Sequence, residues 1–247
     1  MVLLAIVVFI VLHFVDAGYG MMRNSKWGYS INNKRAWFLM EFPIFIAMIG
    51  LWFFSPNHGQ IVPLIFLILF EVHYFERVFI FPFLIKGKGT MPISVMAMGI
   101  TFNILNASMQ GYWLFYRAFD INSNAYPISW LYSPQFIIGL ILFISGFIIN
   151  LHSDKIIRNL RKNDSDNKHY LPRGGLFNYV TSANYFGELI EWLGFAIFTW
   201  SWSGFIFFLW TFANLVPRAA ATYKRYYAEF PEELETKKLK RVFPFIY

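Results

Sequence analysis

One face of a predicted helix combines the amide, carboxylate and guanidinium groups that a nucleotide needs. In NLHSDKIIRNLRK, four polar side chains follow one another at intervals of 4, 4 and 3 residues: Asn150, Asp154, Arg158 and Arg161. Residues spaced in this way lie on one side of an α-helix. Arginines can bind phosphate oxygens in a forked arrangement, and a carboxylate can accept hydrogen bonds from ribose hydroxyls. A helix at the membrane surface with internal salt bridges would show the same pattern, so both interpretations stay open.

Two further predicted helices carry polar faces of the same kind. In TSANYFGELIEWLG, polar side chains at intervals of 4 and 3 residues form one face: Asn184, Glu188 and Glu191. Where the last apolar stretch ends, a third set recurs at intervals of 4 residues: Arg218, Thr222 and Tyr226. Between the first two sets, Pro172, Gly174 and Gly175 favour a tight turn at which the backbone can approach a ligand. The sequence has no G-x-G-x-x-G or P-loop motif, so helices and loops would have to hold any nucleotide.

A second group of polar residues lies inside apolar stretches, where each is costly in lipid and indicates function. Glu41 lies in WFLMEFPIFIAM, two residues before Pro43, which can bend the helix. Two sets recur at intervals of three or four residues, which predicts a shared helix face for each: Glu71, Tyr74 and Arg77, and Asn103, Asn106 and Gln110. Hydrogen bonds between helices, or a buried pair of Glu71 with Arg77, would explain the same residues without catalysis.

The elements that must position these residues are membrane helices. Hydrophobic residues make up 57% of the 247 residues and charged residues only 14%, which is more apolar surface than a soluble domain of this size can bury. Apolar stretches near or above the roughly 17 to 25 residues that a membrane helix needs lie at 2–19, 36–54, 61–85, 91–116, 132–151, 185–200 and 202–217. We therefore predict an all-α, polytopic membrane protein with seven transmembrane helices in a single domain, residues 1–247.

Charge predicts the orientation of these helices, because basic connections alternate with nearly uncharged ones. All of the 21 Lys and Arg residues except Arg77 and Arg117 fall on one side. The positive-inside rule makes that side cytosolic, which places the N-terminus outside and the C-terminus in the cytosol. The net charge of +7 then reflects topology and attraction to anionic lipids, and we expect no nucleic-acid partner. The absence of cysteine excludes disulfides and thiolate metal sites, and we predict no metal site.

Several motifs resemble those of the steroid 5α-reductase family. The longest are NLHSDKIIRNLRK, YLPRGGLFNYVTSANYFGELIEWLGFA and the tail ending in FPFIY. Upstream, WFLMEFP is similar to the family's W-F-L-Q-E-x-P, HYFERVFIFPFL to its H-Y-x-x-R segment, and FNILNASMQGYWL to its F-N-x-x-x-x-Q-G-Y segment. The resemblance spans nearly the whole chain. It implies a seven-helix, NADPH-dependent reductase that saturates the Δ4,5 double bond of 3-oxo-Δ4-steroids.

The resemblance also implies roles for individual residues. Tyr74 would donate a hydrogen bond to the 3-oxo group, and Glu41 would either donate one as a neutral acid or orient the phenol; both stabilise the charge that builds on the oxygen. The family pattern assigns NADPH to residues on the predicted polar faces: Asn150, Asp154, Arg161, Asn184, Glu188, Arg218 and Tyr226. Further candidates for the cofactor site are Arg158, Arg173, Tyr179 and Tyr19.

The steroid would occupy an aromatic cavity formed mainly by the first four helices, with NADPH bound mainly by the last three. Besides Glu41 and Tyr74, the candidates for contact with the steroid are Trp37, Phe102 and Asn106. Met40 stands where the family usually has Gln, and Thr222 and Tyr223 stand where it often has His. These departures leave the exact substrate open.

Two other interpretations remain at this point. One keeps the fold and NADPH but reduces another enone, enoyl or polyprenyl lipid. The other is a membrane methyltransferase of the isoprenylcysteine type, which uses S-adenosylmethionine and would need no clustered arginines. We expect a monomer with a steroid-like lipid as substrate and membrane lipids as partners. Its membrane would be the inner membrane in a bacterium or the endoplasmic reticulum in a eukaryote.

Overall fold

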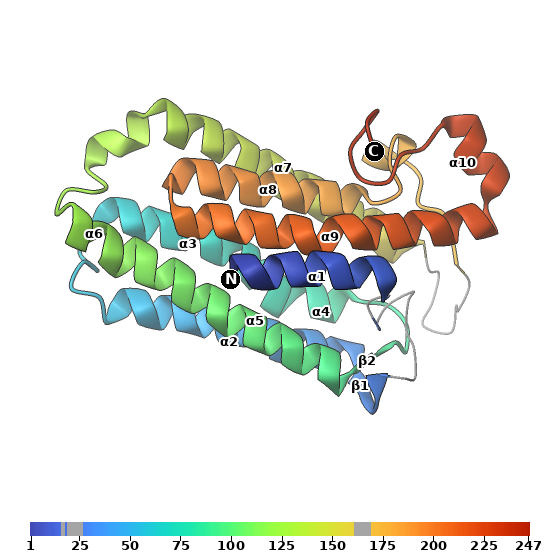
Figure 1. Ribbon diagram of the computed structural model, residues 1–247, viewed down its shortest axis with the longest axis horizontal. Coiled ribbons are helices and arrows are strands. Elements are labelled where there is room, and N and C mark those ends of the chain that lie inside the picture. The colour runs from blue at the N-terminus through green and yellow to red at the C-terminus, as the bar shows by residue number, and fades with distance from the viewer. Residues whose placement is uncertain (16–17, 19–26, 161–168) are drawn as a thin grey trace.

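Helices account for most of the computed structural model, which describes residues 1–15, 18, 27–160 and 169–247 (Figure 1). The longer α-helices are α1 (Val2–Phe14), α2 (Asn33–Phe53), α3 (Ile61–Phe75), α5 (Ile93–Tyr112), α7 (Pro134–Asn159), α8 (Ala183–Thr199) and α9 (Trp202–Glu229). The shorter elements are α4 (Phe81–Leu84), α6 (Ala118–Ile121), α10 (Pro231–Lys237), the π-helical turns η3 (Glu76–Ile80) and η4 (Trp113–Arg117), and the 3-10 turns η5 (Ile128–Tyr132) and η6 (Gly175–Asn178). The mostly helical class is confirmed; among the described residues, the extended elements are two short antiparallel strands, β1 (Ser30–Asn32) and β2 (Thr90–Pro92), and an isolated bridge between Val180 and Lys240.

Each predicted apolar stretch overlaps one of the longer helices, and α2, α7, α8 and α9 extend beyond the predicted bounds. Among the described helices, α2, α7 and α9 are long and apolar enough to cross a membrane, and α1 is a shorter apolar helix. The α-helical part of α3 and α5 ends earlier than predicted, because both continue into π-helical turns. Large apolar side chains face outward, with Leu3 79%, Phe14 85% and Ile141 60% exposed, as contact with lipid requires. The chain is therefore a membrane protein, while the seven spans and their orientation stay predictions.

The short sheet determines where Glu41 of α2 and Asn103 of α5 lie relative to each other. Strand β1 leads directly into α2 and β2 leads into α5, so the paired strands start the two helices together, and the helices then run side by side (Figure 1). Asn32 caps α2, because its side-chain oxygen accepts a hydrogen bond from the backbone N–H of Lys34 at 3.0 Å. This shared start fixes the register at which Glu41 of α2 meets Asn103 of α5.

Glycines let α7 and α8 touch through their backbones. A Cβ atom on Gly146 of α7 would lie 2.3 Å from the backbone nitrogen of Glu191, and one on Gly187 of α8 would lie 2.5 Å from that of Asn150. Small residues allow this approach between helices in lipid, where close packing and hydrogen bonds supply the association energy. The contact brings the polar faces predicted on α7 and α8 together.

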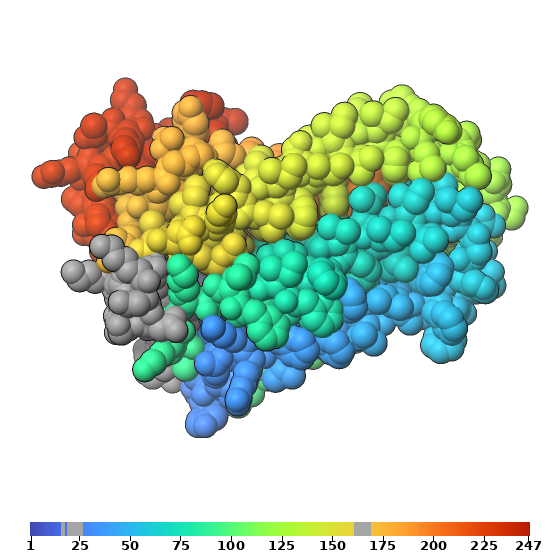
Figure 2. All heavy atoms as spheres, turned by 180° about the vertical axis from the view of Figure 1, so that it is seen from behind, coloured from blue at the N-terminus to red at the C-terminus, as the bar shows by residue number. Residues whose placement is uncertain are grey.

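Aromatic side chains pack α3 against α8. Phe66 and Phe198 have ring centroids 5.5 Å apart, and Phe70 and Trp192 have centroids 5.7 Å apart, within the range in which tilted rings attract one another. Seen from behind (Figure 2), the C-terminal half of α7 lies next to the segment that contains η3 and α4. Helices α3, α7 and α8 thus surround a common region at the level where α3 becomes η3.

The C-terminal tail holds the segment that leads into α8. Backbone N–H groups of Thr181 and Ser182 donate to the carbonyl oxygens of Lys240 and Arg241 at 2.9 and 3.1 Å. Beyond these bonds, tail side chains pack on α8 and α9 in a cluster of Val242, Phe243, Tyr247, Leu189, Leu215 and Val216. The tail therefore supports the loop in which the sequence predicts a cofactor contact.

Candidate active site

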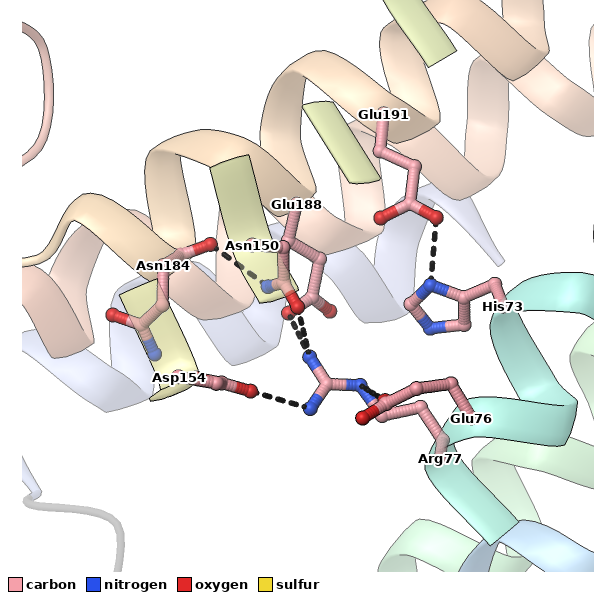
Figure 3. Close-up of polar contacts among 8 residues, drawn as sticks. All are labelled: His73, Glu76, Arg77, Asn150, Asp154, Asn184, Glu188 and Glu191. Carbon is pink, nitrogen blue, oxygen red and sulfur yellow. Dashed lines mark hydrogen bonds and ion pairs between the residues drawn. The ribbon is translucent and has the colours of Figure 1, made fainter. Parts of the chain in front are cut away.

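A buried guanidinium joins α3, α7 and α8 (Figure 3). Arg77 lies in η3, and its Nη1 donates to Oδ2 of Asp154 at 3.0 Å. Its Nη2 donates to Oδ1 of Asn150 at 3.0 Å and to Oε2 of Glu188 at 3.4 Å. Oε2 of Glu76 lies 3.9 Å from Nε of Arg77. Arg77 is therefore the centre of a polar network that unites three helices in an apolar bundle.

The predicted pairing of Arg77 with Glu71 is wrong. An α-helix turns about 100° per residue, so a step of three residues falls about 60° short of a full turn and two such steps fall about 120° short. The π-helical turn that begins at Glu76 rotates Arg77 further. Arg77 consequently points to α7 and α8, and neither carboxyl oxygen of Glu71 has a hydrogen-bond partner among the described residues.

The polar faces of α7 and α8 meet at this guanidinium. Asn150 and Asp154 are buried, and the Nδ2 of Asn150 also donates to the backbone oxygen of Asn184 at 3.0 Å. Asn184 and Glu188 face this contact from α8 (Figure 3). The structure thus brings together these four predicted cofactor residues.

One further predicted cofactor residue, Arg158, lies near the C-terminal end of α7. Arg158 is half-buried, and its Nη1 is enclosed without a hydrogen-bond partner in the described part of the chain. The Oγ of Ser182, just before α8, is enclosed in the same way. Arg161 and Tyr19 lie outside the described residues. Arg158 and Ser182 thus leave buried hydrogen-bonding atoms for a polar ligand.

Arg218, on the predicted polar face of α9, contacts an aromatic ring at the start of α8. The guanidinium of Arg218 lies 5.4 Å from the centroid of the Tyr185 ring, next to Asn184 in sequence. Tyr226 is buried in a cluster with Leu171, Leu234 and Leu239. Arg218 therefore belongs to the same end of the bundle as the α7 and α8 faces, whereas Tyr226 is also part of an apolar cluster.

Two further candidates lie at the surface. Arg173 is exposed and pairs with Glu233 of α10 at 2.7 Å. Tyr179 is 46% exposed and packs on Phe245 of the tail, with centroids 5.2 Å apart. In between, Gly174 and Gly175 adopt positive φ values of 94° and 53°, in agreement with the predicted tight turn.

A second polar group lies on the side of α2 and α5. Asn103 donates to Oε2 of Glu41 at 2.9 Å and to the backbone oxygen of Met40 at 2.8 Å. Tyr74 is buried on α3, packs on Phe70 at 4.7 Å, and interacts with Glu41 and with the Asn106 side chain. Among the described residues, the Nδ2 of Asn106 is enclosed without a hydrogen-bond partner. Glu41, Tyr74 and Asn106 therefore form one cluster.

The predicted aromatic contacts of the steroid are divided between two places. Trp37 of α2 packs on Phe81 of α4 with centroids 5.2 Å apart. Phe102 of α5 packs on Trp210 of α9 at 4.8 Å. Phe102 is a neighbour of Asn103, whereas Trp37 lies one helical turn before Glu41. Trp37 and Phe102 thus lie on α2 and α5, the helices that supply Glu41 and Asn106, and each packs on a different helix.

Comparison with known proteins identifies the family. Residues 89–247 match the family described as 3-oxo-5-alpha-steroid 4-dehydrogenase. A steroid 5-alpha-reductase of Arabidopsis thaliana is 38% identical over 244 residues, which cover 96% of this chain and 90% of the relative. A 3-oxo-5-alpha-steroid 4-dehydrogenase 1 of Bos taurus is 34% identical over 247 residues, which cover 98% of this chain and 93% of the relative.

The chain belongs to the steroid 5α-reductase family. The predicted family and enzyme class are thereby confirmed, and the protein is an oxidoreductase of the steroid 5α-reductase type. This result argues against the methyltransferase interpretation. An oxidoreductase of this type is consistent with a nicotinamide cofactor.

Sequence reasoning missed one buried pair in this 5α-reductase family member. Nδ1 of His73 lies 2.7 Å from Oε1 of Glu191, and both side chains are buried between α3 and α8 (Figure 3). His73 is adjacent to Tyr74, and the two rings have centroids 5.0 Å apart. A histidine in one apolar stretch and a glutamate in another are a weak signal, because their pairing depends on which helices become neighbours.

Proposed function

We propose that this protein reduces the Δ4,5 double bond of 3-oxo-Δ4-steroids to 5α-dihydrosteroids with NADPH. The observation that carries the proposal is the position of two polar clusters on adjacent turns of one helical segment. Tyr74 of α3 belongs to the cluster with Glu41 and Asn106, and Arg77, three residues later, organises the cluster of α7 and α8. A substrate carbonyl at the first cluster and a cofactor at the second would thus lie next to each other.

The first cluster fits an enone carbonyl. The Tyr74 hydroxyl donates a hydrogen bond to the 3-oxo oxygen, and the Glu41 carboxyl, held by Asn103 at 2.9 Å, donates a second one or orients the phenol. Hydrogen bonds in an enclosed, apolar setting stabilise the negative charge that develops on this oxygen during reduction. Asn106 supplies a further buried donor on the same side. Trp37 and Phe102 contribute apolar contacts to the steroid from α2 and α5.

The second cluster fits a phosphorylated dinucleotide. Arg77 orients Asn150 and Asp154 toward α8, where their groups can bind ribose hydroxyls and the carboxamide. The enclosed Nη1 of Arg158 and Oγ of Ser182 lack protein partners among the described residues, which favours a ligand rich in hydrogen-bonding oxygens. The residues that would hold the cofactor are Asn150, Asp154, Arg158, Arg161, Arg173, Tyr179, Asn184, Glu188, Arg218 and Tyr226. When bound, NADPH would supply the hydride that C5 of the steroid receives, and a proton is added at C4 of the steroid.

The membrane arrangement belongs to the same proposal. A single domain with seven spans, N-terminus outside and C-terminus in the cytosol, places the second cluster and the loops after α7 on the cytosolic side, where NADPH is available. The first cluster then lies deeper in the bilayer, where an apolar steroid can enter. We propose a monomer that works in the inner membrane of a bacterium or the endoplasmic reticulum of a eukaryote.

The test is NADPH oxidation by the purified protein in detergent with testosterone, progesterone or androstenedione, with products identified by mass spectrometry. The proposal predicts a product two mass units heavier than the substrate. Tyr74→Phe and Glu41→Gln should each lower kcat/KM by about 100-fold, because Tyr74→Phe removes the phenol donor and Glu41→Gln replaces the acidic O–H by a weaker amide N–H donor. Both variants should still bind NADPH.

A matched control is Tyr112→Phe, because Tyr112 is 55% exposed on α5 and lies outside both clusters. It should leave the rate unchanged. If the wild-type protein binds NADPH and reduces none of the three steroids, the substrate must be another unsaturated lipid. If Tyr74→Phe and Glu41→Gln behave like Tyr112→Phe, the proposed roles of the first cluster are wrong.

A further inference from the structure

The carboxyl group of Glu71, a half-buried residue of α3, differs from those of the buried acids around it. Both of its oxygens are enclosed, and neither has a hydrogen-bond partner among the described residues. The other buried carboxyls near α3 have partners: Asn103 for Glu41 at 2.9 Å, His73 for Glu191 at 2.7 Å and Arg77 for Asp154 at 3.0 Å. The arginine that the sequence offers to Glu71 is thus bound elsewhere.

An enclosed carboxyl without a partner lowers the stability of a protein, because it has lost its hydrogen bonds to water and gained none in return. Such groups are few in folded proteins, and they are typical of sites where function costs stability. Glu71 therefore calls for a partner that is not part of the described chain. Its position determines which partner that is.

Glu71 lies three residues before Tyr74 on α3. Three residues along an α-helix correspond to a rise of about 4.5 Å, with a rotation that leaves both side chains on neighbouring parts of the same face. A ligand whose carbonyl is bound by Tyr74 therefore passes close to the Glu71 carboxyl.

Resting on the proposed function, we propose that Glu71 binds a second polar group of the substrate, a hydroxyl on ring A or ring B of the steroid or on the methyl carbon C19 at the junction of these rings. The steroid nucleus is about two helical turns long, whereas Glu71 is less than one turn from Tyr74, so the carboxyl reaches the rings next to the enone and not the far end. The carboxyl accepts the hydrogen bond of the hydroxyl. Glu71 is in this way a specificity residue, and hydroxylated 3-oxo-Δ4-steroids are the favoured substrates.

The test compares kcat/KM for androstenedione with kcat/KM for its 6β-hydroxy and 19-hydroxy derivatives, in the wild-type protein and in Glu71→Leu and Glu71→Gln. The wild-type protein should favour at least one hydroxylated steroid, and Glu71→Leu should lower that ratio by about 10-fold or more, since a site built to bind a hydroxyl discriminates strongly. Glu71→Gln, which keeps a hydrogen-bonding side chain of the same shape, should keep most of the ratio.

Several results would overturn the inference. If the ratio of kcat/KM for the hydroxylated steroids to kcat/KM for androstenedione is the same in the wild-type protein and in Glu71→Leu, Glu71 does not determine specificity. Loss of turnover of all three steroids in Glu71→Gln would make Glu71 an essential acid instead. If the wild-type protein reduces none of the three steroids with NADPH, the proposed function itself fails, and this inference fails with it.

A second measurement needs no substrate. Without ligand, Glu71→Leu should unfold in detergent at the same temperature as the wild-type protein or at a higher one, because it removes an unpartnered polar group from an apolar setting. A clearly lower unfolding temperature would show that Glu71 has a structural partner and would contradict the inference.

Discussion

Nδ1 of His73 lies 2.7 Å from Oε1 of Glu191, although the two residues are 118 positions apart in sequence. The pair links α3 to α8 immediately beside Tyr74 and one turn after Glu188 on α8. The second oxygen of Glu191 has no partner in the described part of the chain. His73 thus supplies a hydrogen bond to one oxygen of a carboxyl on a residue that is 0% exposed.

Removal of His73 should therefore be costly. His73→Phe keeps the aromatic packing on Trp192 but leaves Glu191 without a hydrogen bond, which should lower the free energy of unfolding by about 1–3 kcal/mol. Glu191→Gln keeps an acceptor for the ring and should cost less. Thermal unfolding of the three proteins in one detergent measures the difference. Equal losses for the two variants would show that packing, and not this bond, holds the pair.

Arg77 should be the residue on which the polar network depends. Arg77→Met leaves Asp154 buried without its cation, which should cost about 3–5 kcal/mol without cofactor. Arg77→Lys keeps the charge but cannot reach Asn150 and Glu188 with a forked group, so its loss should be intermediate. The double variant Arg77→Met with Asp154→Leu should recover part of the stability. Additive losses in this cycle would contradict a direct coupling between Arg77 and Asp154.

The contact of α7 with α8 predicts a sharp difference between glycines. Gly146→Ala and Gly187→Ala place a Cβ atom 2.3 and 2.5 Å from backbone atoms of the opposite helix, so both should force the helices apart, reduce stability and weaken NADPH binding. Gly50→Ala is the matched control, because no atom lies within 4 Å of a Cβ there. It should be neutral or stabilise α2 by up to about 1 kcal/mol. The same loss of NADPH binding in all three variants would contradict the account.

Periodicity alone predicted several features that the structure shows. Asn150 and Asp154 share a face of α7, and Asn184 and Glu188 share a face of α8, because intervals of 3 and 4 residues follow the helical repeat. Periodicity failed for Arg77, which it placed on the same helix face as Glu71, because the two residues are six positions apart and a π-helical turn begins between them. The partners of a side chain on another helix depend on how helices pack, and no spacing within one helix contains that information.

The C-terminal tail should support the cofactor site without touching the chemistry. Val242 is 0% exposed, and Val242→Ala removes two methyl groups from its cluster, which should cost about 1.6 kcal/mol and loosen the hydrogen bonds of Thr181 and Ser182 to the tail. We expect weaker NADPH binding in this variant and an unchanged Kd in Ile246→Ala, where the side chain is 81% exposed. Unchanged NADPH binding in Val242→Ala would show that packing of the tail does not support the cofactor site.

The most direct test of the proposed function follows the hydride itself. NADPH carrying deuterium at C4 of the nicotinamide, prepared in each of its two stereochemical forms, is mixed with the protein and androstenedione for a single turnover. The account predicts that one form of NADPH delivers its deuterium to C5 of the steroid product. It also predicts that the proton added at C4 of the steroid comes from the medium. If neither form places deuterium on C5 while the steroid is still reduced, direct hydride transfer from NADPH is contradicted.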